Sequence, residues 1–205
     1  MLSIHAVNPH TLELLKDLSA RLELDGLRLV GGTSLALQYG HRQSIDLDFF
    51  GHINVEQDEL VAKLSQIGSL IVTNKTPHIL QTVINNVKVD FVEYGFYKWI
   101  DQPILEDGFC LASDKDIAAM KINAIMGRGS KKDFIDLFVL LQHYDLSEIL
   151  NFYKLKYPEY SEYRALLSMT YFNDAEMQDT PILFIQDSWE DIKRTIIDKV
   201  KNYQK

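Results

Sequence analysis

The chain contains the stretch SIDLDFF at residues 44–50, shortly after the small-residue stretch GGTS at residues 31–34. An Asp-x-Asp pair in a strand directs both carboxylates to one side, because successive side chains of a strand alternate between its faces. Carboxylates placed in this way hold hard divalent cations such as Mg²⁺, and small residues let phosphates approach backbone N–H groups. The pattern therefore indicates phosphoryl chemistry, carried by the carboxylates Asp46 and Asp48 and by the small residues Gly31, Gly32, Thr33 and Ser34.

Composition limits the classes to which the protein can belong. With 205 residues, 46% of them hydrophobic, the chain can bury one large core or two small ones. The formal net charge of −8 argues against broad, sequence-independent binding to nucleic acid, although it leaves room for a local basic pocket. We expect no membrane span and no signal peptide, because the apolar runs are too short. The single cysteine, Cys110, fits a reducing compartment, so a folded cytoplasmic protein is expected.

Hydrophobic periodicity predicts a mixed first half and a helical second half. The Asn8-Pro9 start and the spacing of Leu12, Leu15, Leu18 and Leu22 predict the first helix. Strands are expected at residues 27–30, 47–50, 70–73, 78–84 and 87–93, with helices at 33–39 and 56–67. Further helices are expected at residues 114–126, 131–143, 146–156, 160–171 and 189–201. We therefore predict an α+β fold, with a mixed β-sheet flanked by helices in residues 1–112 and a helical domain in residues 113–205.

The predicted hairpin at residues 78–93 carries a third carboxylate. Asn85-Asn86 tolerates positive φ and is suited to the tight turn between its arms. In the second arm, alternation places Lys88, Asp90 and Val92 on one face. A charge inside a mostly apolar strand is costly to bury without a partner, and a cation shared with the first two carboxylates would be such a partner. The predicted metal ligands are Asp46, Asp48 and Asp90.

Charged residues also gather in the predicted helical half. Lys121 and Arg128 are nearly two helical turns apart, and such a pair on one face can neutralise a triphosphate or hold the phosphate backbone of an acceptor. Asp133 and Asp136 share a face of the next helix, where either can orient Lys121 or the acceptor. Arg42, between the two opening motifs, is a further expected phosphate contact.

Four stretches give the chain a resemblance to a known family. LVGGTSL at residues 29–35 and HRQSIDLDF at 41–49 resemble the signature of the AbiEii-type nucleotidyltransferases, the toxin half of bacterial toxin–antitoxin and phage-abortive systems. KINAIMGR at 121–128 and KDFID at 132–136 are similar to that family's K-x₆-R and R-D-x-x-D motifs. Lys132 stands where the family commonly has arginine, which keeps the charge and loses the bidentate geometry. The resemblance covers roughly residues 8 to 142.

This resemblance implies a DNA polymerase β-like nucleotidyltransferase fold and its reaction. In that reaction an acceptor hydroxyl attacks the α-phosphate of an NTP such as ATP, and pyrophosphate leaves. Two Mg²⁺ ions that clamp the attacking and leaving oxygens need several converging carboxylates, which the three aspartates can supply. Asp90 is the expected proton acceptor, and Asp46 and Asp48 are the expected main metal ligands. Lys121 is a further expected catalytic residue, and the expected nucleotide-binding residues are Gly31, Gly32, Thr33, Ser34, Arg42, Arg128, Asp133 and Asp136.

The sequence leaves the acceptor and the partner open. The resemblance implies an RNA acceptor, such as a tRNA 3′ end, and an antitoxin protein as partner. A small-molecule nucleotidyltransferase of the aminoglycoside-modifying kind shares the Asp-x-Asp logic and suits an acidic chain. A non-catalytic nucleotidyltransferase-like module, which binds an antitoxin or a nucleotide without turnover, is the alternative from another class. The third aspartate and the Lys121–Arg128 pair speak against that module.

Overall fold

The computed structural model describes residues 1–21 and 24–204, and the chain divides into two compact units. The first unit contains Met1–Tyr97 and Pro103–Ala112, and the second contains Lys98–Gln102 and Ser113–Lys205. The short segment 98–102, which the predicted division placed with the sheet, is therefore part of the helical unit. The functional division into a domain that carries the metal site and a helical domain stays a prediction. Leu22, part of the first predicted helix, lies outside the described residues.

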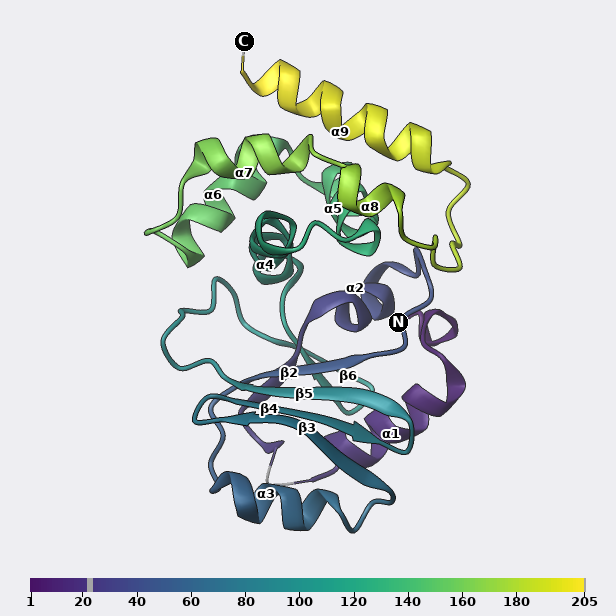
Figure 1. Cartoon of the computed structure of the whole chain (residues 1–205), viewed down its shortest axis with the longest axis vertical. Helices are drawn as coiled ribbons and strands as arrows, with labels where there is room; N and C mark the ends of the chain where they lie inside the picture. The colour runs from purple at the N-terminus through teal and green to yellow at the C-terminus, as the bar shows by residue number, and fades with distance from the viewer. Residues whose placement is uncertain (22–23, 205) are drawn as a thin grey trace. The chain divides into compact units, whose positions relative to one another are not determined.

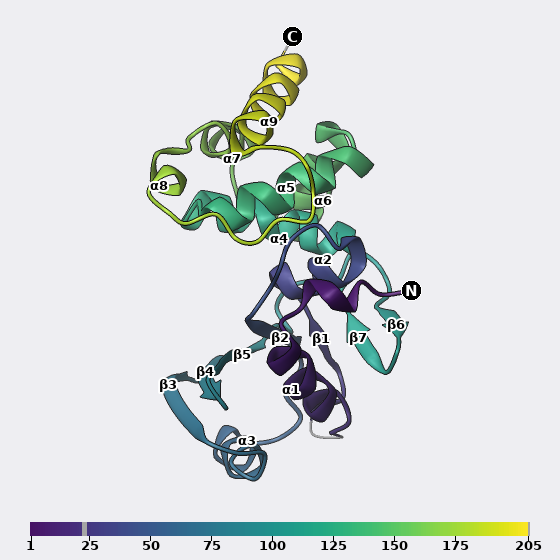
Figure 2. The same cartoon turned by 90° about the vertical axis from the view of Figure 1, so that its right-hand side faces the viewer.

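The first unit is built on a mixed sheet with the strand order β3-β4-β5-β2-β1-β7-β6 among the described residues. Figure 1 shows α3 on one side of this sheet and α2 on the other, and Figure 2 shows α1 beside β1 and β2. The strands are β1 (Leu27–Leu29), β2 (Leu47–Gly51), β3 (Leu70–Thr76), β4 (Ile79–Ile84), β5 (Val87–Glu93), β6 (Ile104–Glu106) and β7 (Phe109–Leu111). The helices are the 3₁₀ turn η1 (Ile4–Ala6), α1 (Pro9–Ser19), α2 (Gly31–Tyr39) and α3 (Gln57–Leu64).

Local sequence signals set the ends of several of these elements. The Asn8 side chain accepts a hydrogen bond of 3.0 Å from the backbone N–H of His10 and so caps α1. Asn85 and Asn86 take φ values of 48° and 66°, so the hairpin between β4 and β5 is confirmed with the two-residue turn that the sequence predicted. Gly40 ends α2 with a φ of 65°.

Alternation along β2 and β5 gives the sheet one apolar face and one charged face. The two strands are parallel neighbours, and their register pairs Leu47 with Val89 and Phe49 with Phe91. These side chains are buried in a core that also contains leucines of α1 and α3, and the rings of Phe49 and Phe91 stack with centroids 5.6 Å apart. The residues between them in each strand point to the opposite face.

The second unit is helical and is centred on α4, which packs against α5, α6 and α7 (Figure 1). Ser113 caps α4, because its hydroxyl accepts a hydrogen bond of 3.1 Å from the backbone N–H of Asp116. The last helix, α9, packs against α5, α6 and α7. The helices are α4 (Asp114–Gly127), α5 (Lys131–His143), α6 (Leu146–Lys156), α7 (Glu162–Met169), α8 (Asn173–Glu176) and α9 (Trp189–Tyr203).

A buried ion pair fastens segment 98–102 to these helices. The Asp116 carboxylate is fully buried and accepts hydrogen bonds from the backbone N–H groups of Ile100 and Asp101 at 2.9 and 3.2 Å. It also pairs with the buried Lys156 of α6 at 2.7 Å. The same ammonium donates to the Lys98 carbonyl and lies 4.5 Å from the ring centroid of Trp99. Buried charges of this kind need each of these partners to offset their desolvation.

Several predicted boundaries differ from the structure. The sequence reasoning missed β6, β7 and α8, and it ended β3 at residue 73 where the strand continues to Thr76. The strands β6 and β7 have three residues each, too few to show a period of two. Helix α7 is shorter than the predicted range of 160–171. Helix α2 begins at Gly31, two residues before the predicted start at residue 33, so the small-residue stretch 31–34 forms the first turn of this helix.

Candidate active site

The chain turns from β1 into α2 beside the carboxylate of Asp48. Gly31 opens α2 with a φ of +68°, a left-handed conformation that favours glycine. A Cβ atom at this position would lie 2.5 Å from Oδ2 of Asp48, so the side chain of Asp48 occupies the space that a larger residue would need. The backbone N–H groups of a first helical turn have no acceptor within the helix and favour negative charge. The helix start therefore suits the carboxylate and an anionic ligand alike.

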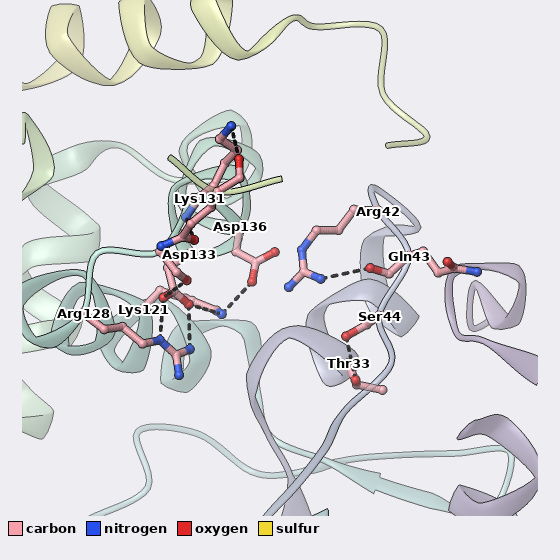
Figure 3. A network of polar contacts seen from close by, with 11 residues as sticks. Thr33, Arg42, Gln43, Ser44, Lys121, Arg128, Lys131, Asp133 and Asp136 are labelled. Carbon is pink, nitrogen blue, oxygen red and sulfur yellow. Dashed lines mark hydrogen bonds and ion pairs between the residues drawn. The ribbon is translucent and has the colours of Figure 1, made fainter. Parts of the chain in front are cut away.

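Thr33 fixes the segment that leads into β2. Its buried hydroxyl contacts the hydroxyl of Ser44 at 2.8 Å (Figure 3). The same hydroxyl donates to the backbone carbonyl of Asp46. Ser34 is also buried, and its hydroxyl accepts from the side chain of Gln38 at 3.2 Å. The hydroxyl groups of Thr33 and Ser34 are therefore already engaged within the protein. The expected contact with phosphates would have to come from the backbone N–H groups at the start of α2.

Asp48 and Asp90 lie directly opposite each other on the parallel strands β2 and β5. Both carboxylates belong to the sheet face away from the Phe49 and Phe91 rings, and Asp46 precedes β2 on the same alternation. Asp90 is 8% exposed, and its Oδ1 atom is buried without a hydrogen-bond partner among the described residues. A buried carboxylate oxygen without a donor is costly, and it fits a ligand atom for a cation or an acceptor for a proton.

Two further residues contact Asp90 that the sequence reasoning did not assign to the site. The Lys88 ammonium lies 3.0 Å from Oδ2 of Asp90, and the Gln81 side chain donates to the same oxygen at 2.9 Å. Burial lowers the pKa of Lys88, but its bond to Asp90 and the charges of all three carboxylates outweigh burial and raise that pKa. All three carboxylates therefore favour a positive charge at the position of this ammonium.

The three aspartates fit a divalent cation in their chemistry and their field. Carboxylate oxygens are the ligands that Mg²⁺ prefers, and the unpartnered Oδ1 of Asp90 leaves one of them open. Within the described residues, no three histidine, cysteine or acidic side chains are already gathered at metal-binding distances. The metal-ligand set of Asp46, Asp48 and Asp90 therefore stays a prediction.

A second cluster of charges lies in the helical unit, where Lys121 and Arg128 converge on one carboxylate (Figure 3). The Lys121 ammonium lies 2.9 Å from Asp133 and 2.6 Å from Asp136, and all three side chains are at most 4% exposed. The guanidinium of Arg128 donates two hydrogen bonds to Asp133, at 2.8 and 3.0 Å. The Ser130 hydroxyl adds a third donor at 2.6 Å. The structure thus joins the K-x₆-R and R-D-x-x-D motifs into one network.

The network also sets the charge state of Asp133. Burial raises the pKa of this carboxyl, but the Lys121 and Arg128 charges and the Ser130 hydroxyl outweigh burial and hold it well below its usual range. Lys121 lies within α4, whereas Arg128 follows Gly127, the last residue of that helix. The two cations therefore do not share the single helical face that the sequence predicted, although both contact Asp133. In the first unit, Arg42 is buried and donates to the Gln43 carbonyl at 3.0 Å (Figure 3).

The family model described as Nucleotidyl transferase AbiEii toxin, Type IV TA system, matches residues 13–203. The chain belongs to the AbiEii nucleotidyltransferase toxin family. The match continues well past residue 142, where the resemblance of the motifs ended, so α6, α7, α8 and α9 all lie within the matched range.

One protein of known sequence and two solved structures are similar to this chain. The protein aq_aa25 of Aquifex aeolicus (strain VF5), described as uncharacterized, is 35% identical over 189 residues, which are 85% of this chain and 86% of that protein. The solved structure of MenT4, a nucleotidyltransferase toxin from Mycobacterium tuberculosis H37Rv, matches with a TM-score of 0.56 at 15% identity, over 92% of this chain and 80% of the other. JHP933 from Helicobacter pylori matches with a TM-score of 0.52 at 17% identity, over 97% and 96%. The predicted α+β nucleotidyltransferase fold is confirmed.

As a member of the AbiEii family, the chain is a nucleotidyltransferase, and the enzyme prediction is confirmed over that of a non-catalytic module. The family gives it an NTP as substrate and an antitoxin as the expected partner. No helix among the described residues combines the length and apolar composition needed to cross a membrane.

Replacing Gly31 with alanine is expected to disturb both folding and activity. The Gly31→Ala variant combines a strained backbone with a clash against Asp48, whereas Gly108→Ala has a similar φ of +80° and no atom within 4 Å of the new Cβ. Backbone strain alone costs about 1–3 kcal/mol in either variant. Displacing Asp48 by about 1 Å should cost a further factor of about 10² in transfer rate, in Gly31→Ala only. Equal activity of the two variants, measured by transfer of labelled nucleotide at matched folded fraction, would remove Asp48 from the site.

Proposed function

We propose that the chain transfers a nucleotide from an NTP to an acceptor hydroxyl in a reaction that depends on a divalent metal, and that it acts as the toxin of a toxin–antitoxin or phage-defence pair. The observation that carries this proposal is the register of β2 and β5, which pairs Asp48 with Asp90 and leaves Oδ1 of Asp90 buried without a donor. Family membership supports the nucleotidyl transfer.

In the proposed reaction, the oxygen of the acceptor hydroxyl forms a bond to the α-phosphorus of the NTP. The bond from that phosphorus to the bridging oxygen of pyrophosphate breaks, and pyrophosphate leaves with the electron pair. Oδ1 of Asp90 takes the proton of the hydroxyl, because Oδ2 already accepts from Gln81 and Lys88. Asp46, Asp48 and Asp90 would hold Mg²⁺, which when bound neutralises charge on the phosphate oxygens.

The remaining predicted residues have supporting roles in this proposal. Gly31 leaves room for the carboxylate of Asp48, and Thr33 holds the backbone of Asp46. The first turn of α2, with Gly31, Gly32, Thr33 and Ser34, would face the β- and γ-phosphates. We also assign Arg42 of the first unit to the binding of nucleotide or acceptor phosphates, and we assign the same role, separately, to the network of the second unit, which consists of Lys121, Arg128, Asp133 and Asp136.

Loss of metal-dependent nucleotide binding in an Asp46→Ala variant tests this proposal. The wild type is expected to bind NTP only with Mg²⁺, and Asp46→Ala is expected to lose that binding because a ligand oxygen is gone. Asp58→Ala is the matched control, since the Asp58 carboxylate is 91% exposed on α3. Binding is measured by calorimetry with and without EDTA. NTP binding by the wild type that ignores EDTA would contradict the metal-dependent reaction.

A labelling experiment identifies the acceptor. The wild type and an Asp48→Asn variant are incubated with each α-³²P-labelled NTP and with total RNA, total protein or aminoglycosides. The proposal expects label in RNA, as the family resemblance implies, and none with Asp48→Asn. Label in aminoglycosides alone would replace RNA with a small molecule as the acceptor, and label in no pool would leave nucleotide transfer by this chain unsupported.

A further inference from the structure

Four polar side chains form one row across four neighbouring strands on the charged face of the sheet. The strand register pairs Asn74 of β3 with Gln81 of β4, Gln81 with Asp90 of β5, and Asp90 with Asp48 of β2. Directly paired residues of neighbouring strands lie on the same face, with Cβ atoms about 5 Å apart. The row therefore runs from the exposed edge strand β3 to the carboxylates of the candidate site.

Hydrogen bonds along this row fix the orientation of the Gln81 amide. Its Nε2 donates to Oδ2 of Asp90 at 2.9 Å, and its Oε1 accepts from Nδ2 of Asn74 at 3.2 Å. An ionised carboxylate only accepts hydrogen bonds, so the donor end of the Gln81 amide faces Asp90, and the donor end of Asn74 satisfies the acceptor end that remains. Gln81 can therefore only donate to the carboxylate in this arrangement.

A β-bulge explains why Asn74 stands opposite Gln81. The register of β3 and β4 pairs Val72 with Thr82 and then Asn74 with Gln81, so Thr73 is the extra residue on β3. Without the bulge, Thr73 would occupy the position opposite Gln81. The Thr73 hydroxyl instead bonds to the Gln81 backbone carbonyl at 3.1 Å. Bulges often re-aim a side chain next to an active site, and this one brings an amide to the row.

We propose that Gln81, oriented by Asn74, is a positioning residue that fixes the carboxylate plane of Asp90 and directs Oδ1 into the site. Gln81 and Lys88 occupy Oδ2 at 2.9 and 3.0 Å, which leaves Oδ1 as the oxygen without a donor among the described residues. This inference rests on the proposed function. It adds that an amide pair on β3 and β4 orients the carboxylate of Asp90 on β5.

The test is a titration of the metal-free protein with Mn²⁺, followed by the electron paramagnetic resonance signal of the free ion. Gln81→Met keeps the length of the side chain and removes both hydrogen bonds. Residues that orient a metal ligand typically contribute a factor of about 10–100 to metal affinity, so Gln81→Met should weaken Mn²⁺ binding by that factor. Asn74→Ala, which removes one hydrogen bond, should weaken it by a smaller factor of about 2–10.

A double-variant cycle separates positioning from general disturbance of the sheet. If Asn74 acts only through Gln81, the variant with both changes binds Mn²⁺ as weakly as Gln81→Met alone. Ile71→Thr, a change on the same face of β3 at a residue 59% exposed, is the control and should keep wild-type affinity. Additive effects, or Mn²⁺ affinity of Gln81→Met within a factor of about 2 of the wild type, would overturn the inference.

Failure of this inference can be told apart from failure of the proposed function. Asp90→Asn is titrated in parallel, and the proposed metal site requires that it lose Mn²⁺ affinity. If Asp90→Asn loses affinity and Gln81→Met does not, only the positioning role is wrong. If neither variant loses affinity, the metal site is wrong and this inference with it. Should Gln81→Met fail to fold, Asn74→Ala at the exposed strand carries the test, and wild-type affinity there overturns the inference.

Discussion

Asp90→Asn is expected to lower the rate of nucleotide transfer by about 10³-fold while the protein remains folded. Asparagine keeps the shape of the side chain and can still accept a hydrogen bond from Gln81 at the position of Oδ2. It cannot take a proton from the acceptor, and it removes one of the three negative charges that act on Lys88. The measurement is the initial rate of transfer from an α-³²P-labelled NTP to the acceptor that the wild type labels.

Asp58→Asn serves as the control for the loss of one negative charge, because Asp58 is an exposed carboxylate of α3 in the same unit. Its rate should stay within a factor of about 2 of the wild type, as expected for a surface substitution. Circular dichroism and thermal melting confirm that both variants fold. An Asp90→Asn variant that keeps more than about a tenth of the wild-type rate would remove Asp90 from the proton-accepting role.

Asp133→Asn is expected to lower the free energy of unfolding by about 3 kcal/mol. Asp133 is fully buried and accepts hydrogen bonds from Lys121, Arg128 and Ser130. The N–H₂ group of an asparagine would face these donors, and the loss of the carboxylate would leave the positive charges of Lys121 and Arg128 less compensated. Lys121 keeps its contact with Asp136, which limits the cost. Urea unfolding at pH 7 measures the change. Asp198→Asn, an exposed carboxylate on α9, is the control and should change stability by less than about 0.5 kcal/mol.

The pH dependence of the same variant has a defined sign. The pKa of Asp133 in the folded protein lies below its unfolded value, so the carboxylate stabilises the fold at every pH above about 4 and loses this contribution as the pH falls further. The difference in stability between the wild type and Asp133→Asn should therefore be equal at pH 7 and pH 5. It should narrow below about pH 4. A difference that grows on acidification would contradict the lowered pKa.

The placement of the three aspartates on one side of the sheet could be predicted from the sequence because its signals are local. A period of two places Asp48 of β2 and Asp46, which precedes that strand, on one side, and the Asn85-Asn86 turn fixes the face of Asp90. The same turn also fixes the partner of Asp90: if Ile84 faces Val87 across a two-residue turn, counting outward pairs Gln81 with Asp90. The pairing of Gln81 with Asp90 could therefore have been predicted from the sequence. The turn between β6 and β7 could also have been predicted, because Asp107-Gly108 is a typical pair for a turn in which both residues have positive φ.

Other parts of the site depend on contacts that no short stretch of sequence encodes. Asn74 reaches the row only because a bulge shifts the register of β3, and a bulge leaves no period in the sequence. The charges of the helical unit were predicted, but their partners follow from the packing of α4 against α5, which brings Lys121 to Asp133 and Asp136. The position of Arg128 also differs from the predicted one, because α4 ends at Gly127 and Arg128 lies beyond its last turn.

Segment 98–102 gives the chain an unusual connectivity. The polypeptide leaves the sheet unit after Tyr97, returns at Pro103, and leaves again after Ala112, so three peptide linkages join the two units. A fragment ending at Ala112 would keep Trp99 and the backbone N–H groups of Ile100 and Asp101 but lose Lys156 and Asp116, which satisfy them. A fragment beginning at Ser113 would bury the Lys156–Asp116 pair with fewer donors. A single cut between Ala112 and Ser113 therefore does not give two fragments that each keep all their contacts. Truncated or split versions of this protein must keep residues 98–102 together with the helices.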